Sequence, residues 1–228
     1  MSAQLPLALR WPANQCFECF VVGANAATLA LVEELAAGRG DSTLFIAGPA
    51  GSGRTHLLVA ACVAAGAQAQ RAQYIDLAVQ PAATIRAFHG TDLLAVDNVD
   101  AIAGNGEAEH ALFDLHNRAR ADGTRLLAAA SLAPGRLGLA LPDLVSRLSA
   151  FTQAGLVALD EPTRREVLRA EAGRRGIGLD EAVIDWLFAH HARDLASLMR
   201  LLAKIDEATL ASRRRVTVPF LRDLLDTG

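Results

Sequence analysis

The sequence predicts an α/β protein in two parts, a parallel sheet covered by helices and then a small all-helical domain. Three observations support this prediction. Short apolar, β-branched segments alternate with helical patterns over residues 14–160, which is typical of strand–helix–strand units. A glycine-rich loop joins the first such strand to the next helix. From residue 161 to residue 228 only helical patterns recur. Residues 1–13 are expected to form a tail.

The expected elements follow one another along the chain. A helix over residues 26–37 ends in the loop Gly38-Arg39-Gly40-Asp41. Strand-like segments are expected at 43–47, 72–77, 92–97, 125–130 and 155–159. Helical patterns separate them at 54–66, 82–88, 107–121 and 142–149. The second part has helical patterns at 162–175, 180–190, 193–211 and 218–226. Because no comparable strand follows residue 160, we place the domain boundary there.

The composition is that of an ordinary globular protein. The 228 residues are 52% hydrophobic and 21% charged, enough to bury a core. The most apolar run, 126–144, is broken by Pro134, Arg136 and Pro142, so no membrane span is expected. The first residues lack the basic start and apolar block of a signal peptide. We therefore expect a cytoplasmic protein with no membrane partner.

The cysteines and the net charge exclude two further classes. Three cysteines, an odd number, argue against a disulfide framework. Cys16 and Cys19 form a CxxC pair, but no second pair follows, so we expect structural cysteines rather than a metal or redox site. The net charge of −3 argues against wholesale contact with DNA phosphates.

The strongest motif is a phosphate-binding loop. Residues 48–55 read Gly48-Pro49-Ala50-Gly51-Ser52-Gly53-Arg54-Thr55, between a strand and a helix. Glycines let backbone N–H groups converge on phosphate oxygens, and the new helix adds its free N–H groups and positive dipole end. Arg54 stands where lysine is expected; it keeps the charge but is no compact point charge between the terminal phosphates. Nucleotide binding is therefore predicted more firmly than turnover.

An acid at the end of a later strand completes the expected metal site. The apolar run 93–96 ends in Asp97, and parallel strands bring such an end beside the loop. The Thr55 hydroxyl and the Asp97 carboxylate, the latter through water, are the expected Mg²⁺ contacts. The alternative for Asp97 is a strand-end turn residue. The next residue, Asn98, cannot act as a base, so intrinsic hydrolysis is expected to be weak or absent.

On these motifs the chain resembles the AAA+ family, and within it the branch of the DnaA replication initiator. The resemblance covers nearly all residues from about 14 to the end, and it implies an AAA+ core with a helical lid, ADP or ATP as the cofactor, and Mg²⁺ as a further ligand. The segment from residue 17 to residue 25 is similar to the part that walls the adenine. The nucleotide-binding residues implied are Phe20, Val21, Asn25, Pro49, Ala50, Gly51, Ser52, Gly53, Arg54, Thr55, His56, Asp97, Ser131 and Arg193.

The resemblance also implies separate roles for three of the polar residues. Ser131 falls on sensor 1, although serine after a strand is common. Arg147, in the phrase Pro142-Asp143-Leu144-Val145-Ser146-Arg147-Leu148, falls on the arginine finger, which acts on a neighbour's site. Its alternative is a surface charge opposite Asp143. Arg193 falls on sensor 2, and its alternative is a pair with Asp194 or another lid acid.

The expected tail carries a second resemblance. Residues Gln4-Leu5-Pro6-Leu7-Ala8-Leu9 resemble the short peptide that inserts into the bacterial sliding clamp. The clamp-binding residues implied are Gln4, Leu5, Pro6, Leu7 and Leu9. Ala8 stands where a second proline is frequent. No helix-turn-helix pattern follows the expected lid, so the chain is similar to DnaA-homologous regulators rather than to the initiator.

The implied function is regulation of replication initiation. With the DNA-loaded clamp, such a protein stimulates hydrolysis of initiator-bound ATP and so prevents re-initiation. The implied partners are the DnaA initiator, the DNA polymerase III sliding clamp (beta subunit), and DNA indirectly through the clamp; a homodimer or a head-to-tail oligomer stays open. Two alternatives remain: a self-contained DnaA-like ATPase such as a helicase loader or a DNA-tethered remodeler, and a clamp-binding adaptor with a vestigial nucleotide site.

Two polar clusters have ordinary explanations. The run Arg213-Arg214-Arg215 is either a solvated helix end or a DNA contact. His190 and His191 have no acidic partner at helical spacing, so surface or packing roles are expected rather than metal binding.

Overall fold

The computed structural model describes residues 15–190, 195–212 and 216–226 of the chain, without the side chains of residues 196, 210–212 and 226. The chain divides into two compact units, Met1–Val157 and Ala158–Gly228. The expected tail at residues 1–13 lies outside the described residues.

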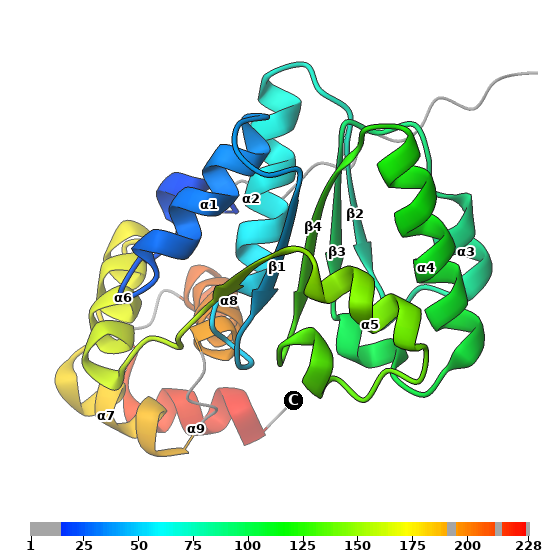
Figure 1. The fold of residues 1–228 in the computed structure, drawn as a ribbon. Helices are drawn as coiled ribbons and strands as arrows, with labels where there is room; N and C mark the ends of the chain where they lie inside the picture. Colours follow the sequence, from blue (N-terminus) through cyan, green and yellow to red (C-terminus); the bar gives the residue numbers. More distant parts are fainter. Residues whose placement is uncertain (1–14, 191–194, 213–215, 227–228) are drawn as a thin grey trace, which may run out of the picture. The chain divides into compact units, whose positions relative to one another are not determined.

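Unit 1 has a central sheet of five parallel strands (Figure 1), in the order β2-β3-β4-β1-β5. The strands are β1 (Thr43–Ala47), β2 (Ala72–Asp76), β3 (Leu93–Asp97), β4 (Arg125–Ala130) and β5 (Thr152–Gly155). Strand β3 is buried along its whole length, and so is β4 after its first residue. Such near-continuous apolar strands are typical of a parallel sheet that is covered on both faces. The predicted α/β fold is confirmed.

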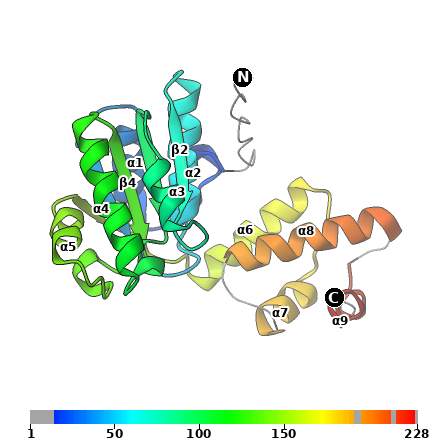
Figure 2. The same ribbon diagram turned by 90° about the vertical axis from the view of Figure 1, so that its right-hand side faces the viewer.

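Helices cover both faces of this sheet (Figures 1 and 2). Helices α1 (Ala26–Ala36) and α2 (Arg54–Ala67) pack on one face, and α3 (Ala82–Ala87), α4 (Gly106–Ala121) and α5 (Pro142–Ser149) lie on the other. Short 3-10 turns occur at η1 (Phe17–Cys19), η2 (Val99–Ile102) and η3 (Pro134–Arg136). In α2 every residue from Leu57 to Cys62 is buried, because this helix lies against the middle of the sheet.

The ends of α4 follow the ordinary chemistry of helix termini. The Asn105 side chain accepts a hydrogen bond from the Ala108 N–H at 3.2 Å and caps the start of the helix. Glu107 and Glu109 lie in the first turn, and Arg118 and Arg120 in the last, which complements the helix dipole. Arg120 therefore lies in the last turn of α4, at its carboxyl end.

The fifth strand differs from the prediction of residues 155–159. It runs from Thr152 to Gly155 and pairs with β1 from Leu44 to Ala47. The Leu156 N–H donates to the Ala47 carbonyl at 2.8 Å. After Ala47 the partner strand turns away into the glycine-rich loop, so residues 157–159 have no strand to pair with. The prediction of a strand at residues 155–159 was wrong because pairing with β1, and not apolar character, sets where the strand begins and ends.

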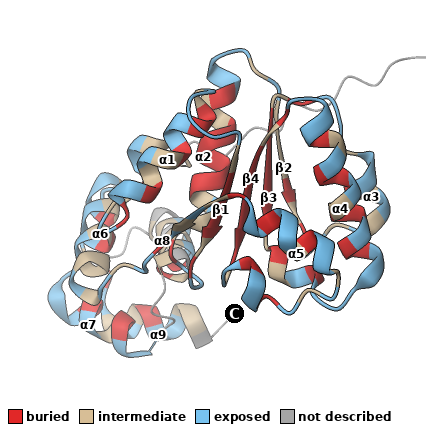
Figure 3. Cartoon of the chain, viewed as in Figure 1, coloured by how far each residue is buried: buried red, intermediate tan, exposed pale blue. Residues whose placement is uncertain are grey.

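Unit 2 consists of helices in the described part of its chain: α6 (Glu161–Arg174), α7 (Glu181–His190), α8 (Leu195–Ser212) and α9 (Val218–Asp226). Its own core includes Leu168, Ile184, Leu187, Ile205 and Leu221. Figure 3 shows the buried residues on the inward sides of these helices. The predicted all-helical second domain is confirmed. Within the described ranges no helix is long and apolar enough to cross a membrane.

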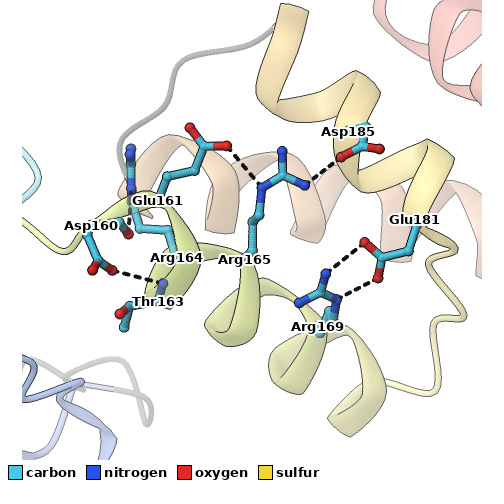
Figure 4. A network of polar contacts seen from close by, with 8 residues as sticks. All are labelled: Asp160, Glu161, Thr163, Arg164, Arg165, Arg169, Glu181 and Asp185. Atoms are coloured by element: carbon cyan, nitrogen blue, oxygen red, sulfur yellow. Dashed lines mark hydrogen bonds and ion pairs between the residues drawn. The ribbon is translucent and has the colours of Figure 1, made fainter.

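A network of charged side chains joins α6 to α7 (Figure 4). Arg165 donates to Glu161 at 3.0 Å and to Asp185 at 2.6 Å. Arg169 makes a two-point contact with Glu181, at 3.0 and 2.7 Å. Planar guanidinium groups suit such contacts, which lie at the surface and add to the buried core between the helices.

Candidate functional site

The glycine-rich loop lies at the carboxyl end of β1 and leads directly into α2 (Figure 1). Gly48 packs so closely that a Cβ there would lie 2.7 Å from the Ser52 Oγ and 2.8 Å from the Leu156 Cβ. Gly53 has a φ of +97°, and a Cβ there would lie 2.6 Å from the Phe20 ring. The loop conformation therefore requires glycine at both positions.

Two buried polar atoms of this loop have no hydrogen-bond partner in the described residues: the Ser52 Oγ and the Arg54 NH1. The first N–H groups of α2 also lack acceptors within the helix. Buried polar atoms without partners are costly in proteins, which makes them a sign of an absent ligand. Anionic oxygens are the acceptors that these donors need, so the residues present fit a phosphate chain.

Thr55 and Asp97, the two predicted metal contacts, lie side by side. The Thr55 hydroxyl donates to the Asp97 Oδ2 at 2.5 Å, and Asp97 is fully buried. The Tyr74 hydroxyl donates to the same oxygen at 3.0 Å, and the Asn98 N–H donates to the Asp97 Oδ1 at 2.8 Å. Burial, and then the Asp97 charge, raise the pKa of Tyr74, so its hydroxyl remains a donor. Tyr74 is a site residue that the sequence did not reveal.

No protein-only cage for a metal is present, because the described residues contain no group of three or more His, Cys, Asp or Glu side chains that could hold an ion. A Mg²⁺ ion at Thr55 and Asp97 would need further oxygens from a nucleotide and water, which is how this cation is usually bound. The donor set fits such an ion.

Arg54 lies near an acid that the sequence analysis missed. Its NH1 is 3.9 Å from the Asp100 Oδ1, and the Ser131 N–H donates to that same oxygen at 3.0 Å. Asp100 of η2 thus links the loop arginine to the end of β4. Its position three residues after Asp97 was the available signal. Ser131 is bonded through its backbone, so a sensor role for its side chain stays a prediction.

The segment predicted to wall the adenine packs against the loop. The buried Phe20 ring meets the His56 ring edge-on, with centroids 5.5 Å apart. His56 Nε2 lies 2.8 Å from the Cys16 carbonyl oxygen. Burial lowers the pKa of His56, although the Cys16 contact opposes this shift. His56 thus packs beside the loop, and a contact of its ring with a nucleotide stays a prediction.

Asn25 and Val21 occupy different environments at this wall. Asn25 is buried, and its amide exchanges two hydrogen bonds with the Val157 backbone, at 2.9 and 2.8 Å. It holds the chain after β5 in place. Val21 is half-buried. Contacts of Val21 and Asn25 with a nucleotide stay predictions.

The structure corrects the expectation for the cysteines. Cys16 and Cys19 form a disulfide across η1, with their Cα atoms 5.2 Å apart. The odd total argued against a framework, but one turn brings this pair within disulfide range without the third cysteine. Cys62 is a buried free thiol, and burial raises its pKa to about 12.

Arg147 lies in the last turn of α5 and is exposed. With Ser42 and Thr43 it lines a hollow of about 370 Å³ at the amino end of β1. The phosphate-binding loop begins beyond the other end of this five-residue strand, roughly 16 Å away along β1. Arg147 therefore lies on the opposite edge of the sheet from the loop of its own chain. The described residues contain no ion pair between Arg147 and Asp143, the alternative weighed for this arginine.

Several predicted residues lie outside the described part of the chain. They are Gln4, Leu5, Pro6, Leu7, Leu9, His191, Arg193 and the run Arg213-Arg214-Arg215. His190 is described: its ring stacks on Trp186, and its Nδ1 lies 2.9 Å from the Trp186 carbonyl oxygen. This is the packing role that the sequence predicted.

Two family models match the chain, one for each unit. The model of the bacterial DnaA ATPase domain matches residues 12–158. The chain belongs to the bacterial DnaA ATPase family. The model of the Hda lid domain matches residues 160–225. This DnaA family member therefore combines a DnaA-like AAA+ domain with an Hda lid, and it is an Hda- and DnaA-like regulator.

Solved structures of other proteins share the fold of this DnaA family member. Domain III of the Thermotoga maritima replication initiation protein DnaA is 24% identical, with a TM-score of 0.77 over 95% of this chain and 97% of that one. AMPPCP-bound DnaA from Aquifex aeolicus is 22% identical, with a TM-score of 0.66 over 85% and 65%. The Thermotoga maritima RuvB Holliday junction branch migration motor is 18% identical, with a TM-score of 0.65 over 93% and 72%. At these identities the likeness is one of fold, and it confirms the predicted AAA+ core and helical lid.

Proposed function

We propose that this DnaA-related regulator binds an adenine nucleotide and stimulates hydrolysis of the ATP bound to a DnaA initiator, with the DNA-loaded sliding clamp as its platform. Such activity would prevent re-initiation. The observation that carries the proposal is the place of Arg147: an exposed guanidinium without an ion-pair partner in the described residues, on the sheet edge opposite its own phosphate-binding loop.

The loop supports ADP or ATP as the ligand. The backbone N–H groups at the start of α2, the Ser52 hydroxyl and Arg54 converge where a phosphate chain would lie. Mg²⁺, when bound, would neutralise phosphate charge beside Thr55 and Asp97. AMPPCP occupies the related Aquifex aeolicus DnaA. Phe20 and His56 would close the base side of the site by packing.

Two residues support weak turnover by the chain itself. Arg54 is drawn toward Asp100 and lacks the compact charge of a lysine. Asn98 follows Asp97, but its amide donates to the Asp76 Oδ1 at 2.8 Å. A side-chain amide is not basic enough to take a proton from water near neutral pH, so this position offers no general base.

Arg147 would act on the nucleotide of a neighbouring molecule. A guanidinium placed beside a transferring phosphoryl group stabilises the negative charge that spreads over its oxygens. A head-to-tail contact would bring the amino edge of this sheet to the phosphate-binding loop of the initiator. The clamp peptide of the tail would bring the chain to DNA, where the initiator acts.

Hydrolysis of initiator-bound ATP tests this proposal, with this protein, the clamp and DNA each omitted in turn. We expect stimulation only when all three are present. Arg147→Ala should lower the stimulated rate by about a thousandfold, the usual worth of an arginine finger, with ADP affinity unchanged. Arg71→Ala is the matched control, since Arg71 is exposed at the same sheet edge beside β2 and forms an ion pair with Asp92.

Other outcomes of this assay would favour the alternatives. Steady turnover of ATP by the purified protein alone supports a self-contained ATPase. Full stimulation by Arg147→Ala supports an adaptor whose nucleotide site has no part in the reaction.

A further inference from the structure

The hollow beside Arg147 holds more than the proposed finger. Arg120, at the end of α4, also lines it, and so does the buried His116 one turn earlier. Ser42 and Thr43 contribute the side along β1. The volume of about 370 Å³ lies within the roughly 300–1,000 Å³ usual for ligand pockets.

The lining carries positive charge without a countercharge. None of its described residues is acidic. Neither Arg120 nor Arg147 forms an ion pair in the part of the chain that the structure describes, whereas Arg165, Arg169 and Arg175 all do. Two like charges beside one hollow repel each other until an anion joins them.

The charges of Arg120 and Arg147 both act on the His116 ring, so both arginines lie near it. Its ring is buried and stacks on Phe151, with centroids 5.7 Å apart. Burial lowers the pKa of His116, a contact with Asn117 opposes this, and the charges of Arg147 and Arg120 lower it further. The same two arginines and the His116 ring therefore surround one hollow.

We propose that this hollow binds the phosphate chain of the nucleotide held by the partner molecule, and that Arg120 is a second guanidinium for it beside Arg147. This inference rests on the proposed function, which uses Arg147 alone. A nucleoside triphosphate carries several negative charges on adjacent phosphoryl groups, so two arginines can each take oxygens of a different group. The planar fork of arginine suits such two-point contacts.

A simpler role for Arg120 makes a different prediction. As a cation in the last turn of α4 it favours the helix dipole, and lysine would serve this role equally well. A fork that binds phosphate cannot be replaced in this way. Arg120→Lys therefore separates the two roles.

The first test measures hydrolysis of DnaA-bound ATP in the presence of clamp and DNA. We expect Arg120→Ala to lower the stimulated rate at least about tenfold, and Arg120→Lys to recover only part of it. Arg71→Ala should stay within about twofold of the unaltered protein, since it removes an exposed pair of little worth at the same edge. Normal stimulation by Arg120→Ala, or full recovery by Arg120→Lys, overturns the inference.

The second test needs no initiator and uses inorganic tripolyphosphate as the probe. ADP and Mg²⁺ first saturate the phosphate-binding loop of the full chain, and the imidazole resonances of His116 are then followed by NMR. Movement of these resonances that persists in Arg71→Ala and is lost in Arg120→Ala supports the anion site. No movement, or equal movement in Arg120→Ala, overturns it. If the probe binds but the unaltered protein never stimulates DnaA, the proposed function fails while the anion site stands.

Discussion

Asp97 illustrates how single residues build the nucleotide site. Its carboxylate is fully buried, and three donors from separate segments reach it: the Thr55 hydroxyl, the Tyr74 hydroxyl and the Asn98 N–H. A buried carboxylate is tolerated when hydrogen bonds surround it. The same donors hold its oxygens beside Thr55, where the proposed Mg²⁺ ion would bind.

At the residue scale, Gly53 just before α2 gives a sharp prediction, with Gly66 inside the helix as its control. Gly53→Ala should destabilise the protein by about 1–3 kcal/mol, because its φ of +97° disfavours a side chain and the new Cβ would collide with Phe20. ADP affinity should fall with it, since the loop must shift. Urea denaturation and calorimetry with ADP measure the two effects.

Gly66→Ala is the matched control for this change. Gly66 lies inside α2, the helix that Gly53 precedes, and a Cβ there meets nothing within 4 Å. Alanine should therefore stabilise the helix by about 0.5–1 kcal/mol, the opposite sign. Equal effects at the two positions would contradict the assigned loop geometry.

Residue chemistry alone predicted part of this site and missed the rest. Thr55 and Asp97 were paired correctly, because a phosphate-binding loop and an acid ending a parallel strand must meet at one sheet edge. Tyr74 carries no motif, and the only signal for Asp100 was its position three residues after Asp97. Their contacts depend on which strand lies next to which, and the local sequence does not contain that information.

At the scale of elements, Glu109 positions the helix that carries Arg147. This buried carboxylate of α4 accepts hydrogen bonds from the N–H groups of Gly104, Ala140 and Leu141, at 2.8, 3.0 and 2.7 Å. Leu141 is the residue before α5. Burial would raise the pKa of Glu109, but the three donors outweigh it and hold the pKa below its ordinary value.

Glu109→Gln should destabilise unit 1 by about 2 kcal/mol, because a neutral amide offers one acceptor oxygen to three buried donors. Stimulated hydrolysis should fall through the loosened α5, with ADP affinity unchanged. Urea denaturation measures the stability.

The pH dependence of this contribution follows from the lowered pKa. The folded pKa of Glu109 lies below the unfolded value near 4.5, so the contribution of Glu109 to stability is complete above about pH 4.5 and is lost as the pH falls through the folded pKa. The difference in the free energy of unfolding between the unaltered protein and Glu109→Gln should therefore shrink on acidification. A difference that stays constant would show that the Glu109 carboxylate is not its source.

The fifth strand and the tail show the limits of pattern at this scale. Apolar character predicted a strand at residues 155–159, but the register with β1 ends the strand at Gly155. Pattern cannot locate such an end, since the partner sets it. The tail lies outside the described residues, and the clamp remains its proposed partner because of its sequence motif.

Replacing both Gln4 and Leu7 by alanine should abolish binding to the clamp and stimulation of hydrolysis together. The wild-type peptide should bind with micromolar affinity or weaker, about −8 kcal/mol or less favourable, since a short segment loses entropy on docking. Size-exclusion chromatography with the clamp measures the association. Replacing Ser2 and Ala3 by glycine is the control, as these residues precede the motif. If the double variant still co-elutes with the clamp, residues 4–9 are not the clamp-binding segment.

At the scale of the whole molecule, the chain consists of two units with separate cores. The glycine-rich loop, Phe20, Asp97 and Arg147 all belong to unit 1. The glycine-rich loop and the hollow beside Arg147 lie at opposite ends of the same parallel strands, so the proposed nucleotide site and the proposed contact with the initiator use different edges of one sheet. This arrangement predicts that a substitution at one edge can abolish nucleotide binding or stimulation of the initiator without affecting the other.

ADP should raise the melting temperature of the protein, because a ligand that binds only the folded state stabilises it by mass action. At free ADP about a hundredfold above its dissociation constant the gain is about 2.7 kcal/mol, which corresponds to a shift of roughly 5–10 °C for a unit of this size. Arg147→Ala should show the full shift, since Arg147 lies at the far edge of the sheet. Gly53→Ala should show little or none, since its loop cannot close on phosphate. Differential scanning calorimetry with and without ADP measures all three proteins. Equal shifts of the melting temperature in all three proteins would mean that the nucleotide binds away from the loop. A reduced shift in Arg147→Ala alone would mean that Arg147 contributes to nucleotide binding in its own chain.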